Sequence, residues 1–342
     1  MALGAGNMSI LRNSVIFLLL VIFVFIIGCA QVYKPDVKPE GSAKSQQDSN
    51  RNQLIDRKPF LVQNRETVRV YFATPDGKNL VPVTLSINPT KEAAKVAVEK
   101  LLAGPENNFS LRTIPEGTKL KDIFLQDRTV YVDLTTEIKK VAQKKNNTEL
   151  ALSSLVLTLT EFKEVDNVQV LIDGKIEKKL GEIEIEKPIK RPKNINYYGD
   201  KKENSIVIFY SDANAMFLVP ISLGVSGKDF PLIALKKLLK GPPVNSGLIG
   251  TCLPQTKVHS LSINNGIASV DFSQEALGYS GGANAETMWV NSVVLTLTMF
   301  DQISAVQFLF NGKKIKYLPE GTDVSLPIPT PQDINFIQQG TL

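Results

Sequence analysis

Cysteine, histidine and tryptophan are scarce in this sequence. Its 342 residues include two cysteines, Cys29 and Cys252, one histidine, His259, and one tryptophan, Trp289. A fold held together by several disulfides is therefore excluded, because such frameworks need several cysteine pairs. A single histidine also severely limits the usual catalytic and metal-binding constellations.

The sequence also lacks a large excess of one charge sign. Its 39 basic and 34 acidic side chains give a net charge of +5. Such a charge slightly favours an anionic membrane surface or cell-wall polymer, and it falls far short of the basic patch that binds nucleic acid. The 43% of hydrophobic and 21% of charged residues are typical of a globular protein, and the length predicts about two domains.

Long hydrophobic runs are missing except near the N-terminus. Residues 15–27 form an uninterrupted apolar run of 13 residues that ends before Gly28 and Cys29. A bilayer-spanning helix needs about 20 apolar residues, whereas a signal-peptide core is shorter. The ending resembles the lipobox of bacterial lipoproteins, in which small residues precede a cysteine that is acylated and becomes the new N-terminus.

This resemblance predicts how the N-terminal segment is processed. Residues 1–28 would be a signal peptide that is removed, and Cys29 would carry the lipid, a diacylglycerol with palmitate. Residues 29–62 are mostly polar and predict a flexible tether between the lipid and the folded part. The alternative is an uncleaved signal anchor with an incidental cysteine. Translation starts at either Met1 or Met8.

The chain contains an internal repeat. The segment VLTLT stands at residues 156–160 and again at 294–298, and other matches lie 137 to 139 positions apart. These matches are LVP at 80 and 218, KLLAGP at 100 and KLLKGP at 237, TVYVDLTTE at 129 and IASVDFSQE at 267, and DGK at 173 and NGK at 311. One duplicated unit therefore accounts for most of the sequence.

The two copies also share their C-terminal ends. PIKRPKNINY at residues 188–197 matches PIPTPQDINF at 327–336. We interpret each as an extended strap that belongs to its own unit and packs an aromatic ring, since its prolines exclude a helix or a central strand. The predicted domains are residues 63–199 and 200–338, followed by a tail at 339–342.

Each unit is predicted to have the element order β-β-α-β-β-α-β. The first unit has strands at 68–73 and 80–87, a helix from Asn88 or Thr90 to Gly104, a hairpin at 119–134, a helix at 149–162 and a last strand. Pro82 and Pro220 suggest that the second strand of each unit is an edge strand. The second unit has a predicted capping box at Ser226 and Asp229 and an Asn-Gly hairpin turn at 265–266.

The VLTLT segment is ambiguous alone, because alternation of apolar residues with threonine resembles a strand. Its flanks decide for a helix, since residues 149–162 and 286–300 are free of proline and glycine and each precedes a strand candidate. The fold class is thus α+β, with helices packed on a sheet in two repeated units.

These motifs resemble the GerM domain, a module of bacterial sporulation and germination lipoproteins. The resemblance covers residues 67–317 and includes LVP, LLxGP, VDLTTE or VDFSQE, and the run TLTEF…VQVLIDGK. It implies an endospore-forming host, a place in the envelope of the developing spore and a fold similar to the ring-building motif of sporulation and secretion assemblies. The family supplies no settled catalytic residues to carry over.

Two acidic pairs are the sharpest candidate site. Asp133 with Glu137, repeated as Asp271 with Glu275, could supply the two carboxylates of a glycoside hydrolase. The alternative is that each aspartate ends a strand and binds backbone amides of a turn, which is common for this residue. The alternative is favoured, because the segment has few aromatic rings for a sugar and an enzyme seldom needs its site twice.

The other reactive residue types offer less. His259 has no histidine partner in the first unit, where Leu120 stands opposite it, and is predicted to be a packing or surface residue. Cys252 lies opposite Ile114 and is predicted to act as a small apolar residue, although a reactive thiol is the alternative. Trp289 is expected in the core.

The sequence therefore predicts a non-catalytic, lipid-anchored scaffold or assembly factor. The expected location is the extracytoplasmic face of the cell membrane. The expected partners are the membrane, through the lipid on Cys29, and other sporulation envelope proteins, but not nucleic acid, and neither a cofactor nor a metal is expected. The alternative is a module that binds or hydrolyses peptidoglycan of the spore cortex.

Overall fold

The computed structural model describes residues 58–143, 145–278 and 281–337, without the side chains of residues 145 and 146. These residues belong to one compact unit. Cys29, the expected signal peptide, most of the tether and the tail lie outside the described residues. No helix in the described part of the chain is long and apolar enough to cross a membrane.

Both repeats have the predicted α+β element order. The first consists of β1 (Arg65–Ala73), β2 (Leu80–Thr90), α2 (Ala93–Ala103), β3 (Leu120–Gln126), β4 (Thr129–Leu134), η1 (Thr136–Gln143), α3 (Lys145–Leu159) and β5 (Asn167–Ile172), with the short strands β6 (Lys179–Leu180), β7 (Ile183–Glu184), β8 (Ile189–Lys190) and β9 (Tyr197–Tyr198). The second consists of β10 (Asn204–Asp212), β11 (Leu218–Val225), α4 (Phe230–Lys240), β12 (Leu248–Ile249), β13 (Val258–Asn264), β14 (Ile267–Phe272), η2 (Gln274–Leu277), α5 (Gly282–Leu297) and β15 (Ala305–Phe310), with β16 (Ile328–Pro329) and β17 (Phe336–Ile337).

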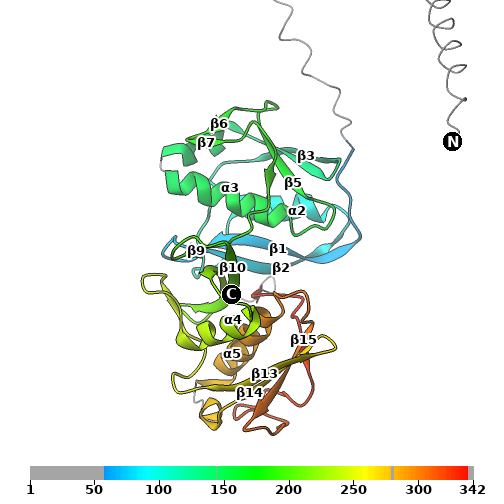
Figure 1. The fold of residues 1–342 in the computed structure, drawn as a ribbon. Helices are drawn as coiled ribbons and strands as arrows, with labels where there is room; N and C mark the ends of the chain where they lie inside the picture. The colour runs from blue at the N-terminus through cyan, green and yellow to red at the C-terminus, as the bar shows by residue number, and fades with distance from the viewer. Residues whose placement is uncertain (1–57, 144, 279–280, 338–342) are drawn as a thin grey trace, which may run out of the picture. The chain divides into compact units, whose positions relative to one another are not determined.

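The main strands of each repeat divide between two sheets, and the helices lie between them (Figure 1). In the first repeat β6 and β7 form a separate two-stranded sheet. In the first repeat one sheet holds the antiparallel hairpin β1–β2 and the other has the order β3-β4-β5-β8. Fully buried residues come from both sheets and both helices, as Val70, Ala97, Val132 and Val156 illustrate. Burial of such a side chain contributes about 2 kcal/mol, so the helices and sheets stabilise one another.

The VLTLT segment is helical in both repeats, as predicted. Its central threonine is polar although the helix is buried, and a hydrogen bond to a neighbouring strand explains why. Thr158 and Thr296 are fully buried. The Thr158 hydroxyl accepts a hydrogen bond from the backbone N–H of Tyr71 (3.1 Å), and Thr296 does the same for Phe209 (3.1 Å). A buried N–H at a sheet edge needs an acceptor, and the helix supplies it.

The straps connect the two repeats. Each begins on its own repeat, where β8 pairs with β5 and β16 pairs with β15. Each then ends on the other repeat, because β9 pairs in parallel with β11 and β17 pairs in parallel with β2. The sequence indicated that each strap is extended, but not that its end pairs with the other repeat.

The prediction that β2 and β11 are edge strands was wrong. Each lies between its hairpin partner and a short strap strand. Proline is tolerated there because the strap pairs only with Thr84 and Leu85 in β2, beyond Pro82, and only with Ser222 and Leu223 in β11. The missing proline N–H therefore falls outside the paired stretch.

The starts of α2 and α4 differ in detail from the prediction. Strand β2 runs on to Thr90, and α2 begins after Glu92, whose side chain makes no capping bond. In the second repeat Asp229 is the N-cap and accepts from the backbone N–H of Leu232 (3.2 Å). Gly104 and Gly241 end the two helices at positive φ, and the sequence predicted the helix end at Gly104.

Candidate functional site

The repeated aspartates hold a turn in each repeat. Asp133 lies at the end of β4, and its Oδ1 accepts from the backbone N–H of Gly174 (2.8 Å). Asp271 does the same for Gly312 (2.8 Å). Each turn directly follows the neighbouring parallel strand, so the aspartate fixes a turn about 40 residues further along the chain.

The repeated glutamates bind a different set of groups. Glu137 and Glu275 stand in the first turns of η1 and η2. The pKa of each carboxyl is lowered, first by a hydrogen bond from the hydroxyl of Thr135 or Ser273 and then by its own backbone N–H. A general acid needs a raised pKa at neutral pH, and these environments act in the opposite direction.

The structure changes which residue of the first repeat corresponds to His259. Strand pairing places Val258 opposite Phe272 and Leu120 opposite Leu134, so His259 corresponds to Lys121 and not to Leu120. Its Nε2 lies 3.1 Å from Oδ1 of Asn311. Lys121 binds Asp173 in the same place (2.9 Å), so the imidazole takes over a surface contact between an edge strand and a turn.

Cys252 and Trp289 lie near one another in the second repeat. Burial raises the pKa of the Cys252 thiol to about 12, so the thiol stays protonated and unreactive at neutral pH. Trp289 is 2% exposed and packs against Phe272 and Phe308, as expected of a core residue. Within the described residues, no three His, Cys, Asp or Glu side chains converge to hold a metal ion.

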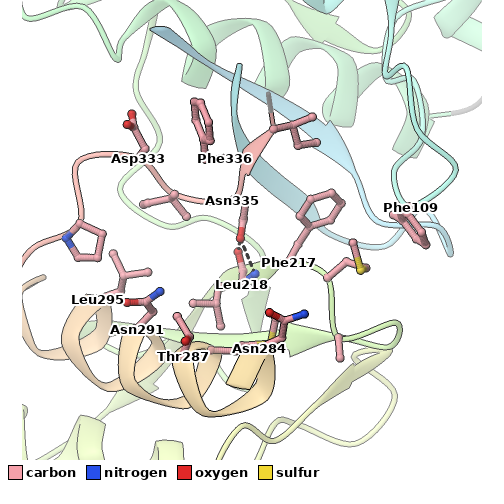
Figure 2. Close-up of a pocket in the computed structure, with 16 residues that line it drawn as sticks. Phe109, Phe217, Leu218, Asn284, Thr287, Asn291, Leu295, Asp333, Asn335 and Phe336 are labelled. Atoms are coloured by element: carbon pink, nitrogen blue, oxygen red, sulfur yellow. Dashed lines mark hydrogen bonds between the residues drawn. The ribbon is translucent and has the colours of Figure 1, made fainter. Parts of the chain in front are cut away.

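The second repeat contains a cleft of about 550 Å³, within the usual range for small-ligand and side-chain pockets. Figure 2 shows Asn284, Thr287 and Asn291 along α5 on one side and the strap on the other. The apolar part of the lining consists of Phe109, Ala215, Met216, Phe217, Leu218, Met288, Leu295, Pro331, Ile334, Phe336 and Ile337. This cleft can bind an apolar group and offers amides at its rim.

The corresponding cleft of the first repeat is larger, about 820 Å³, and more polar. Its lining comes from Asp76, Gly77, Lys78, Leu80, Asn147, Glu149, Leu150, Ser153, Leu157, Pro192, Asn194, Ile195, Asn196, Tyr197, Tyr198 and Asn245. Each cleft also includes a loop residue from the other repeat, Asn245 here and Phe109 in the second cleft. Neither cleft includes the acidic pairs.

An asparagine side chain joins the repeats at the floor of each cleft. Oδ1 of Asn335 accepts from the backbone N–H of Leu218 (2.7 Å), and its Nδ2 donates to the carbonyls of Leu218 (2.8 Å) and Pro82 (2.7 Å). Figure 2 shows the contact with Leu218. One side chain thereby binds the LVP strands of both repeats.

Asn196 makes the mirror set of bonds. Its Oδ1 accepts from the N–H of Leu80, and its Nδ2 donates to the carbonyls of Leu80 and Pro220, all at 2.7 Å. Both asparagines have a positive φ, 48° and 53°, a conformation that asparagine tolerates better than most residues. We call Asn196 and Asn335 the asparagine clasp.

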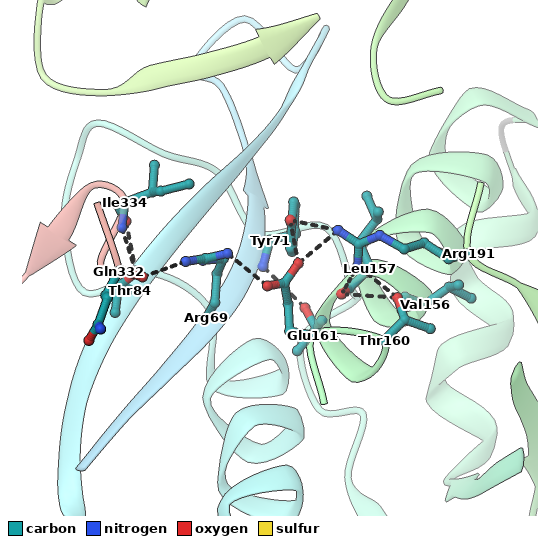
Figure 3. Close-up of polar contacts among 11 residues, drawn as sticks. Arg69, Tyr71, Thr84, Val156, Leu157, Thr160, Glu161, Arg191, Gln332 and Ile334 are labelled. Atoms are coloured by element: carbon teal, nitrogen blue, oxygen red, sulfur yellow. Dashed lines mark hydrogen bonds and ion pairs between the residues drawn. The ribbon is translucent and has the colours of Figure 1, made fainter. Parts of the chain in front are cut away.

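The first repeat adds a partly buried ionic network to this junction (Figure 3). Glu161 accepts from Arg69 (2.8 Å), from the hydroxyl of Tyr71 (2.8 Å) and from Arg191 (2.7 Å). Burial alone raises the pKa of Glu161, but the two arginines outweigh it and the pKa is lowered. Arg69 also donates to the carbonyl of Gln332 (2.7 Å) and so holds the strap of the second repeat.

Neither the clasp nor the network was predicted from the sequence. The signal for the clasp was present, since the triplet Ile-Asn-aromatic ends both straps. The aromatic residue was taken as the important one, yet Phe336 is half exposed and the asparagine makes the bonds. The network has no repeated pattern, because Val207, Phe209, Met299 and Thr330 stand at the corresponding positions.

Comparison with known proteins agrees with this architecture. The family described as "Germane: Sporulation and spore germination" matches residues 69–178 and 197–316, which is one match in each repeat. The spore germination protein GerM of Bacillus subtilis (strain 168) is 27% identical over 279 residues, or 75% of each chain.

A solved structure is also similar to this chain. The tandem GerMN domains of the sporulation protein GerM from Bacillus subtilis superpose with a TM-score of 0.63 at 26% identity, covering 79% of this chain and 99% of that one. This match confirms the fold of two repeated α+β domains, and neither relative's description names a catalytic activity. The chain therefore belongs to the Germane family of sporulation and spore germination proteins, and its role lies in sporulation and germination.

Proposed function

We propose that the protein is a non-catalytic, lipid-anchored scaffold or assembly factor in the envelope of the developing spore. The observation that carries this proposal is the reciprocal exchange of straps, locked by the asparagine clasp. Two similar domains held in this way offer surfaces whose spacing does not change. A scaffold needs such surfaces, whereas an enzyme needs a reactive cleft.

The use of the acidic residues supports a scaffold over an enzyme. In each of the two aspartates one carboxylate oxygen accepts a hydrogen bond from a turn N–H. The two glutamates accept hydrogen bonds that lower their pKa. Because the same arrangement occurs in both repeats, it is explained by a building block that was duplicated. A hydrolytic site would require one carboxyl that stays protonated at neutral pH.

A fourfold variant separates the two functions. Asp133→Asn, Glu137→Gln, Asp271→Asn and Glu275→Gln retain the carbonyl acceptors but remove every carboxylate of the two pairs. We expect an endospore-forming host that carries this variant to form and germinate spores at wild-type frequency. A normal level of folded protein combined with a loss of sporulation would instead indicate carboxylate chemistry.

The lipid anchor is the second part of the proposal. The apolar run and Cys29 support attachment to the extracytoplasmic face of the membrane, and the polar tether supports a folded part held away from the lipid. In cells fed with labelled palmitate, the wild-type chain should take up label and sediment with membranes. Cys29→Ala should lose the label, and label that persists would disprove the assignment.

Binding of cortex peptidoglycan is a second candidate function. The polar cleft of the first repeat favours it, because two tyrosines, several amides and Glu149 line a space large enough for a sugar. The mature chain should then sediment with purified sacculi, and Asn147→Ala with Glu149→Ala should reduce the bound fraction. Binding that is unchanged in this variant would remove the cleft from consideration.

A further inference from the structure

One sheet edge of the first repeat is covered by the segment that enters it. Pro59 forms an antiparallel bridge with Phe124 of β3. The next residue, Phe60, is 4% exposed, and its ring meets Phe162 edge to face with the centroids 5.8 Å apart. Val62 is also buried and donates its N–H to Lys91. We call residues 58–62 the entry segment.

The same edge of the second repeat has no such cover. Strand β13 corresponds to β3 and lies at the end of its sheet. Across the residues that the structure describes, no strand pairs with its outer side. Ser262, the counterpart of Phe124, is exposed, and Leu261 is half-buried whereas its counterpart Ile123 is 8% exposed.

The site of the entry-segment aromatic ring is also open in the second repeat. Phe162 is 2% exposed, because Phe60 and the guanidinium of Arg65, 4.9 Å from the ring centroid, pack on it. Its counterpart Phe300 is half-buried, and within the described ranges no aromatic ring or guanidinium stacks on it. Next to it Met299 is 48% exposed.

The difference follows from the exchange of straps. The chain reaches the second repeat through β9, which pairs with β11. It then begins β10 at Asn204 without passing β13. Both repeats therefore have this sheet edge and this aromatic site, but the chain covers them only in the first repeat.

We propose that the outer edge of β13 and the Phe300 site bind an extended segment of another protein. The segment would run antiparallel to β13, place an aromatic side chain on Phe300 and place an aliphatic residue two positions later, as Phe60 and Val62 do in the first repeat. Backbone hydrogen bonds supply affinity in this mode of recognition, and alternate side chains supply specificity. The proposal names a docking site for the proposed scaffold and rests on that function.

A second copy of this chain is a poor occupant. To donate its entry segment, that copy would have to withdraw Phe60 from Phe162 and expose β3. The edge of β13 would be covered while the edge of β3 in the donating copy is uncovered, so the exchange yields no net free energy of binding. A partner whose extended segment is not already packed meets no such cost.

A peptide with the sequence of the entry segment is the most direct probe. The peptide KPFLVQNRET, residues 58–67, would be labelled with fluorescein and titrated with the mature chain, residues 29–342, in detergent micelles. We expect saturable binding by fluorescence anisotropy. The same peptide with alanine for its phenylalanine should bind about tenfold more weakly, because an aromatic anchor dominates such a contact.

Variants of the chain locate the site. Phe300→Ala should weaken binding about tenfold, whereas Val244→Ser, an exposed apolar residue in a loop, should leave it unchanged. Hydrogen exchange keeps the test informative if Phe300→Ala unfolds. In the wild-type chain the peptide should slow exchange of the β13 amides and leave β3 unaffected.

Three outcomes would overturn the proposal. These are the absence of saturable binding, protection confined to β3, which would mean displacement of the chain's own entry segment, and cross-links between two copies at β13 without peptide. The peptide assay does not depend on the lipid or on spore formation. A negative result with normal sporulation by the fourfold acidic variant would therefore reject the docking site and leave the scaffold function standing.

Discussion

The two repeats share their internal bonds and differ in what covers them. Both use a helix threonine to bind a strand amide and an aspartate to bind a glycine amide, and both receive an asparagine at the LVP strand. The first repeat is further closed by the entry segment and by the ionic network around Glu161. Bonds that recur in both copies hold the fold together, and features found in one copy show where the two repeats differ in what they can bind.

The largest effect is expected where this contrast is strongest. Phe162→Ala should cost about 4 kcal/mol of the free energy of unfolding, because a fully buried ring is removed. Phe300→Ala should cost about half as much, since the ring is already half solvated. Urea unfolding followed by circular dichroism measures both, and equal losses would mean that the open site is not a real difference between the repeats.

Removing either asparagine of the clasp should lower the free energy of unfolding by the same amount. Asn335→Ala and Asn196→Ala should each cost about 3 kcal/mol, because each leaves three backbone groups without a partner and places alanine at positive φ. Asn194→Ala, two residues before Asn196 in the strap, removes only a contact with Ser205 and serves as the control. A large difference between the two clasp variants in thermal melting would argue against equivalent roles.

The ionic network should add an acid-sensitive contribution to stability that the second repeat lacks. The pKa of Glu161 is lowered in the folded state, so its contribution is fully present above its ordinary value of 4.5 and is lost as the pH falls through the folded value. Glu161→Gln should cost about 2 kcal/mol at neutral pH and less in acid. Stability measured against pH tests this, with exposed Glu149→Gln as the control, and an unchanged pH profile would contradict it.

The helix threonines should give the smallest and most equal effects. Thr158→Val and Thr296→Val each remove one acceptor from a backbone N–H and should cost about 1 kcal/mol. Thr287→Val on the exposed side of α5 should change nothing measurable. If only one of the two central threonines mattered, the VLTLT segment would not serve the same purpose in both repeats.

Local features of the fold were predictable from the sequence, and long-range ones were not. The Asn265–Gly266 turn and the helical VLTLT segments were identified from neighbouring residues. Five of the six clasp bonds join residues 116 to 253 positions apart through side-chain amides, and no local pattern reports such a bond. The terminal Ile-Asn-aromatic triplets were noticed because they repeat, but repetition alone could not say that each strap ends on the opposite domain.

The strap exchange also constrains how the protein forms. Thr84 binds Ile334, which lies 250 positions further along the chain, so the first repeat is completed only after the second repeat has been synthesised. Contacts this distant in sequence slow folding, because the entropy of closing a long loop is lost before the contacts can stabilise the fold. A newly made chain would thus present an unfinished first repeat until β17 pairs with β2, and a chaperone would find its substrate during that interval.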